Sequence, residues 1–337
     1  MYKKILVTLG PSSMKKDIIT ECANLGVYLF RINLSHTPLD EIAATIEKVR
    51  GWTNIPICLD SEGAQLRNQK MVSESVALKV GDEVNIHFDP VIGDANNISF
   101  SPVGIARQFV VGDKISIDFD HVQLTVTKIN KDGALAKVDF GGKVGSNKAA
   151  DVPRELNFDP LTTKDREAIK IGLELDIRNF ALSFANTPED VELMRSLCGQ
   201  DVNIICKIES PTGLFNLDGI IDHADEILID RGDLSRKTPI EKVPFLQRRI
   251  ISKARSRKTP VFVATNLLES MVTRKSPTRA EVNDVVSTLL MGADGLVLAA
   301  ETAIGNFPVE AVTMIRKLID ESEMWTPDTS LSEIMGG

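Results

Sequence analysis

The chain reads NIICKIE at residues 203–209 and EILIDRGD at residues 226–233. Each segment is a short β-branched apolar run that ends in charged residues, and this pattern predicts a buried strand with polar side chains at its carboxyl end. Lys207 and Glu209 stand two residues apart, so they share one face of the first of these strands. The same pattern recurs along most of the chain.

Strand-like and helix-like segments alternate almost from end to end, as expected for parallel strands joined by crossover helices. The predicted strands are Lys3–Gly10, Val27–Ser35, Ile55–Ser61, Asn179–Phe184, Asn203–Glu209, Glu226–Asp230, Pro260–Thr265 and Asp294–Ala300. The predicted helices are Met14–Leu25, Leu39–Val49, Asp165–Leu175, Glu189–Leu197, Val243–Arg255, Arg279–Met291 and Val309–Glu321. Eight strands with their helices predict an α/β fold, the closed (β/α)8 TIM barrel.

The alternation is interrupted between residues 68 and 157. Gly-Asp, Asp-Gly and Gly-Gly turns separate period-2 segments there, among them Glu83–Phe88, Lys114–Phe119, Val122–Ile129 and Ala136–Phe140. We therefore predict a small all-β domain at residues 68–157, inserted after strand three. Residues 1–67 and 158–325 would form the barrel, and residues 326–337 a short tail.

Composition argues against several classes of function. The 337 residues are 43% hydrophobic and 26% charged, with a net charge of −8 and no basic run, which argues against binding to a nucleic-acid backbone. The chain lacks the apolar core of a signal peptide and the roughly 20 apolar residues of a membrane span, so we expect a cytoplasmic protein without a membrane partner. The four cysteines lack C-x-x-C spacing, and we expect buried, reduced thiols rather than a disulfide or a zinc site.

Polar residues collect where the predicted strands end, and active residues of such barrels lie at that rim. They are Arg31, Asn33, Ser35 and His36; Asp60 and Ser61; Ser183; Lys207 and Glu209; Asp230 to Asp233; Thr265; and Glu301 with Thr302. A single residue of this kind is usually a solvated rim residue. Seven strands with such endings indicate a site.

The chemistry of this set indicates a metal and a phosphate. Glu209 and Asp233 offer the hard oxygens that suit Mg²⁺, although ion pairing with Lys207 and Arg231 is an alternative use of these carboxylates. A lysine beside a metal suits a migrating phosphoryl group. Arg31 and Arg67 are plausible phosphate clamps, and the backbone around Gly232 could hold a carboxylate.

The sequence resembles the pyruvate kinase family along nearly its whole length. The matching segments are Thr8–Ser13, Arg31–His36, Lys207–Glu209, Arg231–Leu234, Ala264–Met271, Pro277–Glu281 and Glu301–Ala303. The resemblance implies a barrel with a mobile β-barrel lid, and phosphoryl transfer from phosphoenolpyruvate to ADP with Mg²⁺ or Mn²⁺. Its products would be pyruvate and ATP.

The resemblance also implies a role for each matching residue. Lys207 would neutralise the phosphoryl group in flight, and Thr265 would lie near the carbon that is protonated. Arg31, Ser183, Lys207, Gly232, Asp233 and Thr265 would bind the substrate; Glu209 and Asp233 the divalent metal; Asn33, Ser35, Asp60 and Ser61 a monovalent cation; and Pro11, His36, Arg67 and Lys148 the nucleotide.

Some positions depart from the family pattern. Gln65 replaces a charged residue tied to potassium dependence, so a requirement for K⁺ stays open. Asp230 replaces a small residue before Arg-Gly-Asp, and its carboxylate could weaken anion binding or add a metal contact. The regulatory C-terminal domain of the family has no counterpart in these residues, so we expect no allosteric control of the usual kind.

Two other functions stay open. One is an enzyme of another pathway that uses the same phosphoenolpyruvate chemistry with a different acceptor, which the changes at Gln65 and Asp230, and at Ile304 in place of the family's usual lysine after Ala303, would suit. The other is a non-catalytic binding homologue, since fold alone does not fix function. A homo-oligomer is also open, because apolar helix residues such as Val285, Leu289 and Leu290 could pack the barrel or a partner subunit.

Overall fold

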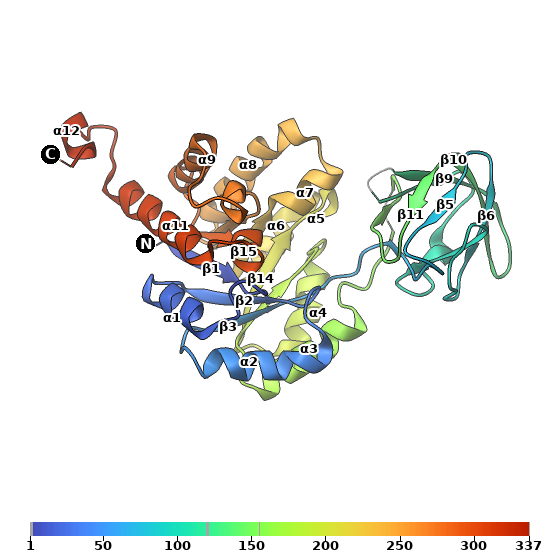
Figure 1. Cartoon of the computed structure of the whole chain (residues 1–337), viewed down its shortest axis with the longest axis horizontal. Helices are drawn as coiled ribbons and strands as arrows, with labels where there is room; N and C mark the ends of the chain where they lie inside the picture. The colour runs from blue at the N-terminus through green and yellow to red at the C-terminus, as the bar shows by residue number, and fades with distance from the viewer. Residues whose placement is uncertain (1–2, 119–120, 155, 337) are drawn as a thin grey trace. The chain divides into compact units, whose positions relative to one another are not determined.

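The computed structural model describes residues 3–118, 121–154 and 156–336 of the chain (Figure 1). It contains two compact units: Met1–Gly63 with Thr163–Gly337, and Ala64–Thr162. The end of the predicted strand at Phe119 and the end of the predicted tail at Gly337 lie outside the described residues.

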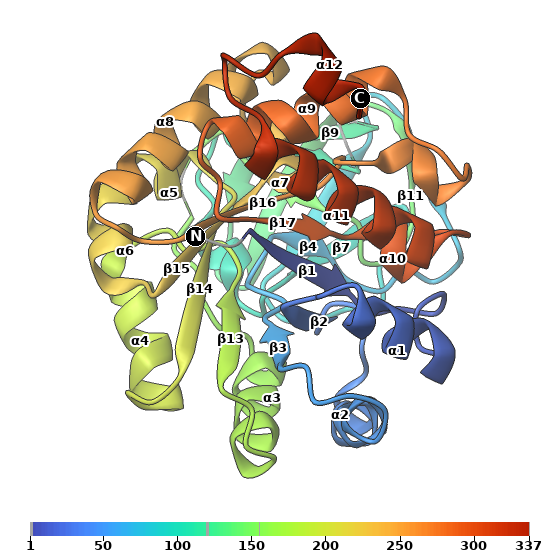
Figure 2. The ribbon, with the colours of Figure 1, turned by 90° about the vertical axis from the view of Figure 1, so that its left-hand side faces the viewer.

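The first unit contains a closed barrel of parallel strands in the order β1-β17-β16-β15-β14-β13-β3-β2 (Figure 2). These strands are β1 (Lys4–Thr8), β2 (Leu29–Asn33), β3 (Ile57–Asp60), β13 (Asn179–Leu182), β14 (Asn203–Ile208), β15 (Glu226–Asp230), β16 (Val261–Ala264) and β17 (Gly295–Leu298). The predicted TIM barrel is confirmed. Most strands are a residue or two shorter at their ends than predicted, because the flanking residues already belong to loops.

Helices surround the barrel strands in Figure 2. They are α1 (Lys16–Asn24), α2 (Ile42–Arg50), α3 (Thr163–Glu174), α4 (Pro188–Cys198), α5 (Pro211–Phe215), α6 (Leu217–His223), α7 (Arg231–Lys237), α8 (Val243–Ser256), α9 (Arg279–Leu290), α10 (Ala300–Ala303), α11 (Pro308–Met324) and α12 (Leu331–Ile334). Single 3-10 turns lie at Leu39–Glu41, Ile240–Lys242 and Glu269–Val272. Every helix predicted from periodicity is present.

The sequence pattern missed the shortest helices. The prediction had no helix between strands five and six, where α5 and α6 lie, and none at the residues of α7. It also extended the last strand to Ala300, which begins α10 instead, and gave the tail no helix. Segments of four to seven residues make no more than two turns, which is too little for a 3.6-residue period to be recognised.

The barrel strands are buried on both faces, as expected when helices cover a parallel sheet. Alternate residues point inward and form one cluster, which in chain order contains Leu6, Leu29, Cys58, Ala181, Ile205, Leu228, Phe262, Ala264 and Val297. Their neighbours, such as Ile227 and Ile229, are equally buried and face the helices. All four cysteines are buried free thiols, as predicted.

Among the described residues of the second unit, the secondary structure is β apart from a 3-10 turn at Ile105–Gln108. Its strands are β4 (Arg67–Asn68), β5 (Val76–Leu78), β6 (Glu83–His87), β7 (Asn97–Ser101), β8 (Lys114–Ile117), β9 (Val122–Ile129), β10 (Gly133–Phe140), β11 (Gly142–Val144) and β12 (Ala150–Asp151). Seven of them form a sheet in the order β12-β8-β9-β10-β6-β7-β4, and β11 pairs with β5.

The two strands at the ends of this order, β12 and β4, lie next to each other. Asn68 N–H donates to the Lys148 carbonyl (3.0 Å), and Ala150 N–H donates to the Leu66 carbonyl (2.9 Å). The sheet therefore curls into a small barrel around its own apolar core. The compact unit begins before residue 68 and ends after residue 157 because Leu66 and Phe158 also pack against this core.

The three apolar residues of α9 that could pack the barrel or a partner subunit differ in burial. Val285 and Leu289 are buried, which agrees with core packing, but Leu290 is 51% exposed.

Among the described residues, we find no helix with the length and apolar character that a bilayer crossing needs.

The barrel interior gives a stability test. Phe262 is fully buried in the inward-facing cluster, so Phe262→Ala should leave a cavity and lower the free energy of unfolding by about 3–5 kcal/mol. Phe245→Ala is the matched control, because Phe245 on α8 is 72% exposed and its loss should change stability by no more than about 0.5 kcal/mol. Urea denaturation followed by circular dichroism measures both. Equal losses in the two variants would contradict this packing.

Candidate active site

A buried lysine lies at the centre of the polar residues at the barrel rim. Lys207, near the end of β14, is only 5% exposed. Its Nζ lies 2.8 Å from Glu209 Oε1, 3.4 Å from Asp60 Oδ2 and 3.9 Å from Asp230 Oδ2, and it donates to Ser183 Oγ at 3.0 Å. Burial acts to lower the pKa of Lys207, but these three carboxylates outweigh it and raise the pKa, so the amine stays charged.

Glu209 is the most buried acid of the group. Its Oε2 accepts a hydrogen bond from Phe184 N–H at 2.7 Å. Its Oε1 accepts no well-aligned hydrogen bond within the part of the chain that the structure describes, although the Lys207 amine lies 2.8 Å away. Burial raises the pKa of Glu209 to about 8, even though Lys207 acts in the opposite direction. A buried oxygen with an unused lone pair suits a cation.

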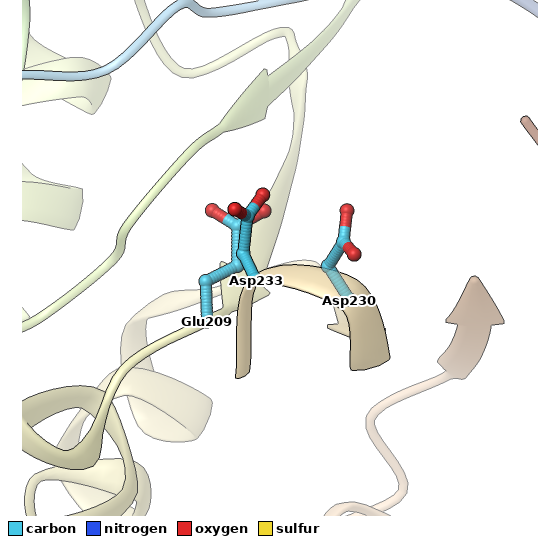
Figure 3. A group of neighbouring side chains, drawn as sticks. All are labelled: Glu209, Asp230 and Asp233. Carbon is cyan, nitrogen blue, oxygen red and sulfur yellow. The ribbon is translucent and has the colours of Figure 1, made fainter. Parts of the chain in front are cut away.

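Three carboxylates converge beside this lysine. Glu209, Asp230 and Asp233 each offer an oxygen, and these oxygens lie within 4.8 Å of one another. Figure 3 shows the three side chains projecting to the same side of the ribbon, from the end of β14 and the start of α7. Asp233 Oδ1 also accepts from Arg236 Nη1 at 2.8 Å. The carboxylates of Glu209 and Asp233, predicted from the sequence to lie at one rim, are close together in space, and the Asp230 carboxylate lies beside them.

The alternative use of these carboxylates in ion pairs is partly right. Lys207 does pair with Glu209, but Arg231 pairs with neither acid. Its guanidinium donates to the Thr265 carbonyl through Nε (3.0 Å) and Nη2 (2.7 Å), and it binds Asp284 on α9 at 2.6 Å. The suggested pairing with Arg231 is therefore wrong, because α7 begins at this residue and turns its side chain toward α9.

The start of α7 contains an internal hydrogen-bonded cluster. Asp230 caps the helix: its Oδ1 accepts from Gly232 N–H (3.1 Å) and from the Thr265 hydroxyl (2.7 Å). Burial acts to raise the pKa of Asp230, but Lys207 and the Thr265 hydroxyl outweigh it and lower the pKa. Thr265 has a φ of +73°, a conformation that few residues other than glycine adopt, and Arg231 holds its carbonyl in place.

A second polar network fills the mouth of the barrel between β2, β3 and β13. Arg31 is buried, binds Asp60 Oδ2 at 2.7 Å and donates to Thr8 Oγ1 at 2.9 Å. Ser183 is bound to Ser61 through both its N–H (2.9 Å) and its hydroxyl (2.7 Å). Arg31, Asp60, Ser61, Ser183 and Lys207 thus form one connected set.

The residues predicted for a monovalent cation lie on adjacent strands. Asn33 and Asp60 are paired in the register of β2 and β3. Asn33 Oδ1 accepts from Ser35 N–H at 2.9 Å, whereas the Asp60 carboxylate binds Arg31, Lys207 and Ser183.

The residues predicted for the nucleotide are divided between the units. Pro11 and His36 are exposed in the barrel unit. Arg67 and Lys148 belong to the β unit, where Arg67 donates to Gln65 Oε1 (3.2 Å) and Lys148 pairs with Asp118 (3.1 Å). Their role in nucleotide binding stays a prediction.

Sequence reasoning missed several partners in the site. Neither the Phe184 N–H that binds Glu209 nor the Arg236 that binds Asp233 was predicted. The i,i+3 spacing of Asp233 and Arg236 could have revealed the second, had α7 been recognised as a helix. Glu301 lay in the predicted rim set, but it is buried and binds the backbone N–H groups of Leu268 and Ala299, which indicates a structural role.

At its carboxyl rim, the TIM barrel brings together a buried lysine, the arginines Arg31 and Arg236, and three carboxylates, an arrangement suited to an enzyme that transfers phosphoryl groups. The family model for the pyruvate kinase barrel domain matches residues 2–312. The chain belongs to the pyruvate kinase family, whose members convert phosphoenolpyruvate to pyruvate by phosphoryl transfer. It is accordingly a phosphotransferase of this type.

Individual relatives agree with the family assignment. The pyruvate kinase of Methylorubrum extorquens is 35% identical over 326 residues, which cover 95% of this chain and 68% of the relative. That of Bacillus licheniformis is 35% identical over 332 residues, and the chain spans only 57% of its length. A crystal structure of a pyruvate kinase from Cryptosporidium parvum superposes with a TM-score of 0.85 at 28% identity, covering 97% of this chain and 70% of that one.

The raised pKa of Glu209 predicts a pH-dependent metal affinity. A proton on Glu209 competes with a metal ion, so Mn²⁺ affinity should fall about tenfold for each pH unit below pH 8 and level off above it. Calorimetry with Mn²⁺ from pH 6 to pH 9 measures this dependence. Glu209→Gln should bind Mn²⁺ weakly at every pH, and an affinity of the unaltered protein that stays constant from pH 6 to pH 8 would contradict the prediction.

Proposed function

We propose that this chain transfers the phosphoryl group of phosphoenolpyruvate to ADP at the rim of its barrel, with Lys207 as the central catalytic residue. The observation that carries the proposal is the buried, charged Lys207 amine beside the convergent carboxylates of Glu209, Asp230 and Asp233. Membership of the pyruvate kinase family supports the same chemistry.

Glu209 and Asp233 would hold the divalent cation, Mg²⁺ or Mn²⁺. Their oxygens are the hard ligands that these ions prefer, and Glu209 Oε1 has a lone pair to offer. When bound, such an ion polarises phosphoryl oxygens and offsets their negative charge. Arg236, which donates to Asp233 Oδ1, would help to orient the Asp233 carboxylate.

Lys207 would bind the phosphoryl group and neutralise its charge during transfer. The surrounding carboxylates hold the amine in its charged form, so no change of protonation is needed when the substrate arrives. Arg31 and Ser183 would bind the substrate from the neighbouring strands, and Asp60, bound to both Arg31 and Lys207, would fix their positions.

Thr265 and the start of α7 would contact the rest of phosphoenolpyruvate. The Thr265 hydroxyl would lie near the carbon that receives a proton when enolpyruvate becomes pyruvate. Arg231 binds the backbone carbonyl of Thr265, so the Thr265 hydroxyl is positioned before substrate binds. The backbone of Gly232 and Asp233 would lie beside the substrate's carboxylate.

The remaining assignments rest on the resemblance to the family. Asn33, Ser35, Asp60 and Ser61 would hold K⁺ if the enzyme requires it, and Pro11, His36, Arg67 and Lys148 would bind ADP. The cytoplasmic location stays a prediction from the sequence.

A coupled assay of pyruvate formation from phosphoenolpyruvate, ADP and Mg²⁺, run with and without K⁺, tests the proposal. If no pyruvate forms, the chain would be better assigned as an enzyme with a different phosphoryl acceptor or as a non-catalytic homologue. Calorimetry with phosphoenolpyruvate and Mg²⁺ separates these two assignments. Activity that does not change when K⁺ is omitted would remove the monovalent cation from the mechanism.

Lys207→Met should lower kcat by at least about 1,000-fold, because the charge that meets the migrating phosphoryl group is lost. Phosphoenolpyruvate should still bind through Arg31 and the metal. The matched control is Lys253→Met, which removes a lysine of α8 that pairs with Asp218 away from the barrel rim and should keep its activity. Thermal unfolding checks that both variants are folded. Near-normal turnover in folded Lys207→Met would remove this residue from the mechanism.

A further inference from the structure

We propose that Asp230 is an internal competitor for the substrate's carboxylate and thereby sets the affinity of this site for phosphoenolpyruvate. The inference rests on the proposed function, and it concerns a residue that no assigned role includes. Its basis is that one oxygen of the Asp230 carboxylate already accepts from two donors, the Gly232 N–H and the Thr265 hydroxyl, while its other oxygen lies 3.9 Å from Lys207 Nζ.

The two donors are suited to a carboxylate, because they bind one in this structure. Asp230 Oδ1 lies 3.1 Å from the Gly232 nitrogen and 2.7 Å from Thr265 Oγ1. The donors are also fixed in place: Arg231 holds the Thr265 carbonyl, and a side chain added at Gly232 would come within 2.8 Å of Thr265 Cγ2. The donors are thus close together and have little freedom to separate.

The position of Asp230 matches where a substrate carboxylate would lie. Phosphoenolpyruvate carries its phosphate and its carboxylate on the same carbon, so the two groups bind a few ångströms apart. Asp230 Oδ2 lies 3.9 Å from Lys207 Nζ, the proposed phosphoryl partner. A substrate phosphate at Lys207 would therefore bring its carboxylate to the place that Asp230 holds.

Competition follows from the chemistry of the donors. An N–H and a hydroxyl each have a single proton to give, so they cannot satisfy two carboxylates at full strength. Two carboxylates in contact also repel each other. The substrate must displace Asp230 from at least one donor, and each lost charge-assisted hydrogen bond reduces the net gain from binding.

The charge of Asp230 has the same effect. Its carboxylate lies 3.9 Å from the Lys207 amine, beside the carboxylates of Glu209 and Asp233. Without this charge, an anionic substrate would meet less repulsion.

The test compares three forms of the full chain: the unaltered protein, Asp230→Ala and Asp230→Asn. The alanine variant frees both donors and removes the charge. The asparagine variant removes the charge but keeps an oxygen that can accept from Gly232 and Thr265, so it also preserves the cap of α7. Asp218→Ala, on the exposed surface of α6, controls for loss of one negative charge elsewhere.

Calorimetry with Mg²⁺ present measures the binding of phosphoenolpyruvate and, separately, of inorganic phosphate, which has no carboxylate. We expect Asp230→Ala to bind phosphoenolpyruvate about tenfold more tightly than Asp230→Asn, since freed donors and not charge distinguish these variants. Inorganic phosphate should bind equally to both. Asp218→Ala should resemble the unaltered protein with either ligand. Thermal unfolding verifies that every form is folded.

Three results would overturn the inference. Equal affinity of the alanine and asparagine variants for phosphoenolpyruvate would show that Asp230 does not compete for the donors, and would leave the proposed function intact. A loss of Mn²⁺ affinity in Asp230→Ala alone, with no gain for phosphoenolpyruvate, would identify Asp230 as a metal ligand instead. Failure of every form to bind phosphoenolpyruvate would overturn the proposed function together with this inference.

Discussion

The geometry of the site depends on the burial of one positive charge. An ammonium group removed from water is tolerated only with close anionic partners, and Lys207 has them from three strands: Asp60 at the end of β3, Glu209 just after β14 and Asp230 at the end of β15. The order of the barrel strands brings these ends together at one rim. The acids that surround the lysine are also those that can bind a cation, so one electrostatic requirement organises both functions.

Periodicity predicted every barrel strand and all the longer helices, and the i,i+2 spacing placed Glu209 next to Lys207. The partners that set the finer geometry were not predictable in the same way. Arg231 binds Asp284, 53 positions along the chain, and Glu209 binds the N–H of Phe184. Phe184 and Thr265 have positive φ angles of 51° and 73°, which neither residue type favours. Tertiary packing imposes these conformations, and local sequence carries no sign of it.

One segment that resembles the pyruvate kinase family has a structural role in this chain rather than a chemical one. The segment Pro277–Glu281, part of the resemblance to pyruvate kinases, forms a capping box in which Thr278 and Glu281 bind each other's backbone at the start of α9. Glu281 also accepts from the N–H and hydroxyl of Ser270, at 2.7 and 2.6 Å, which ties the loop after β16 to that helix. The motif thus supports the loop that follows Thr265 rather than contributing a reacting group.

The hydrogen bonds of Asp165 have a consequence for how such a chain could be rearranged. Asp165, in the first turn of α3, accepts from the N–H groups of Glu62 (2.7 Å) and Gly63 (3.2 Å). The points at which the chain leaves and re-enters the barrel are therefore fastened to each other within the barrel itself. The entropic cost of closing a loop between these two points rises only slowly with the length of the loop. Evolution or protein engineering could thus exchange the inserted module, or shorten it to a hairpin, without rebuilding the scaffold.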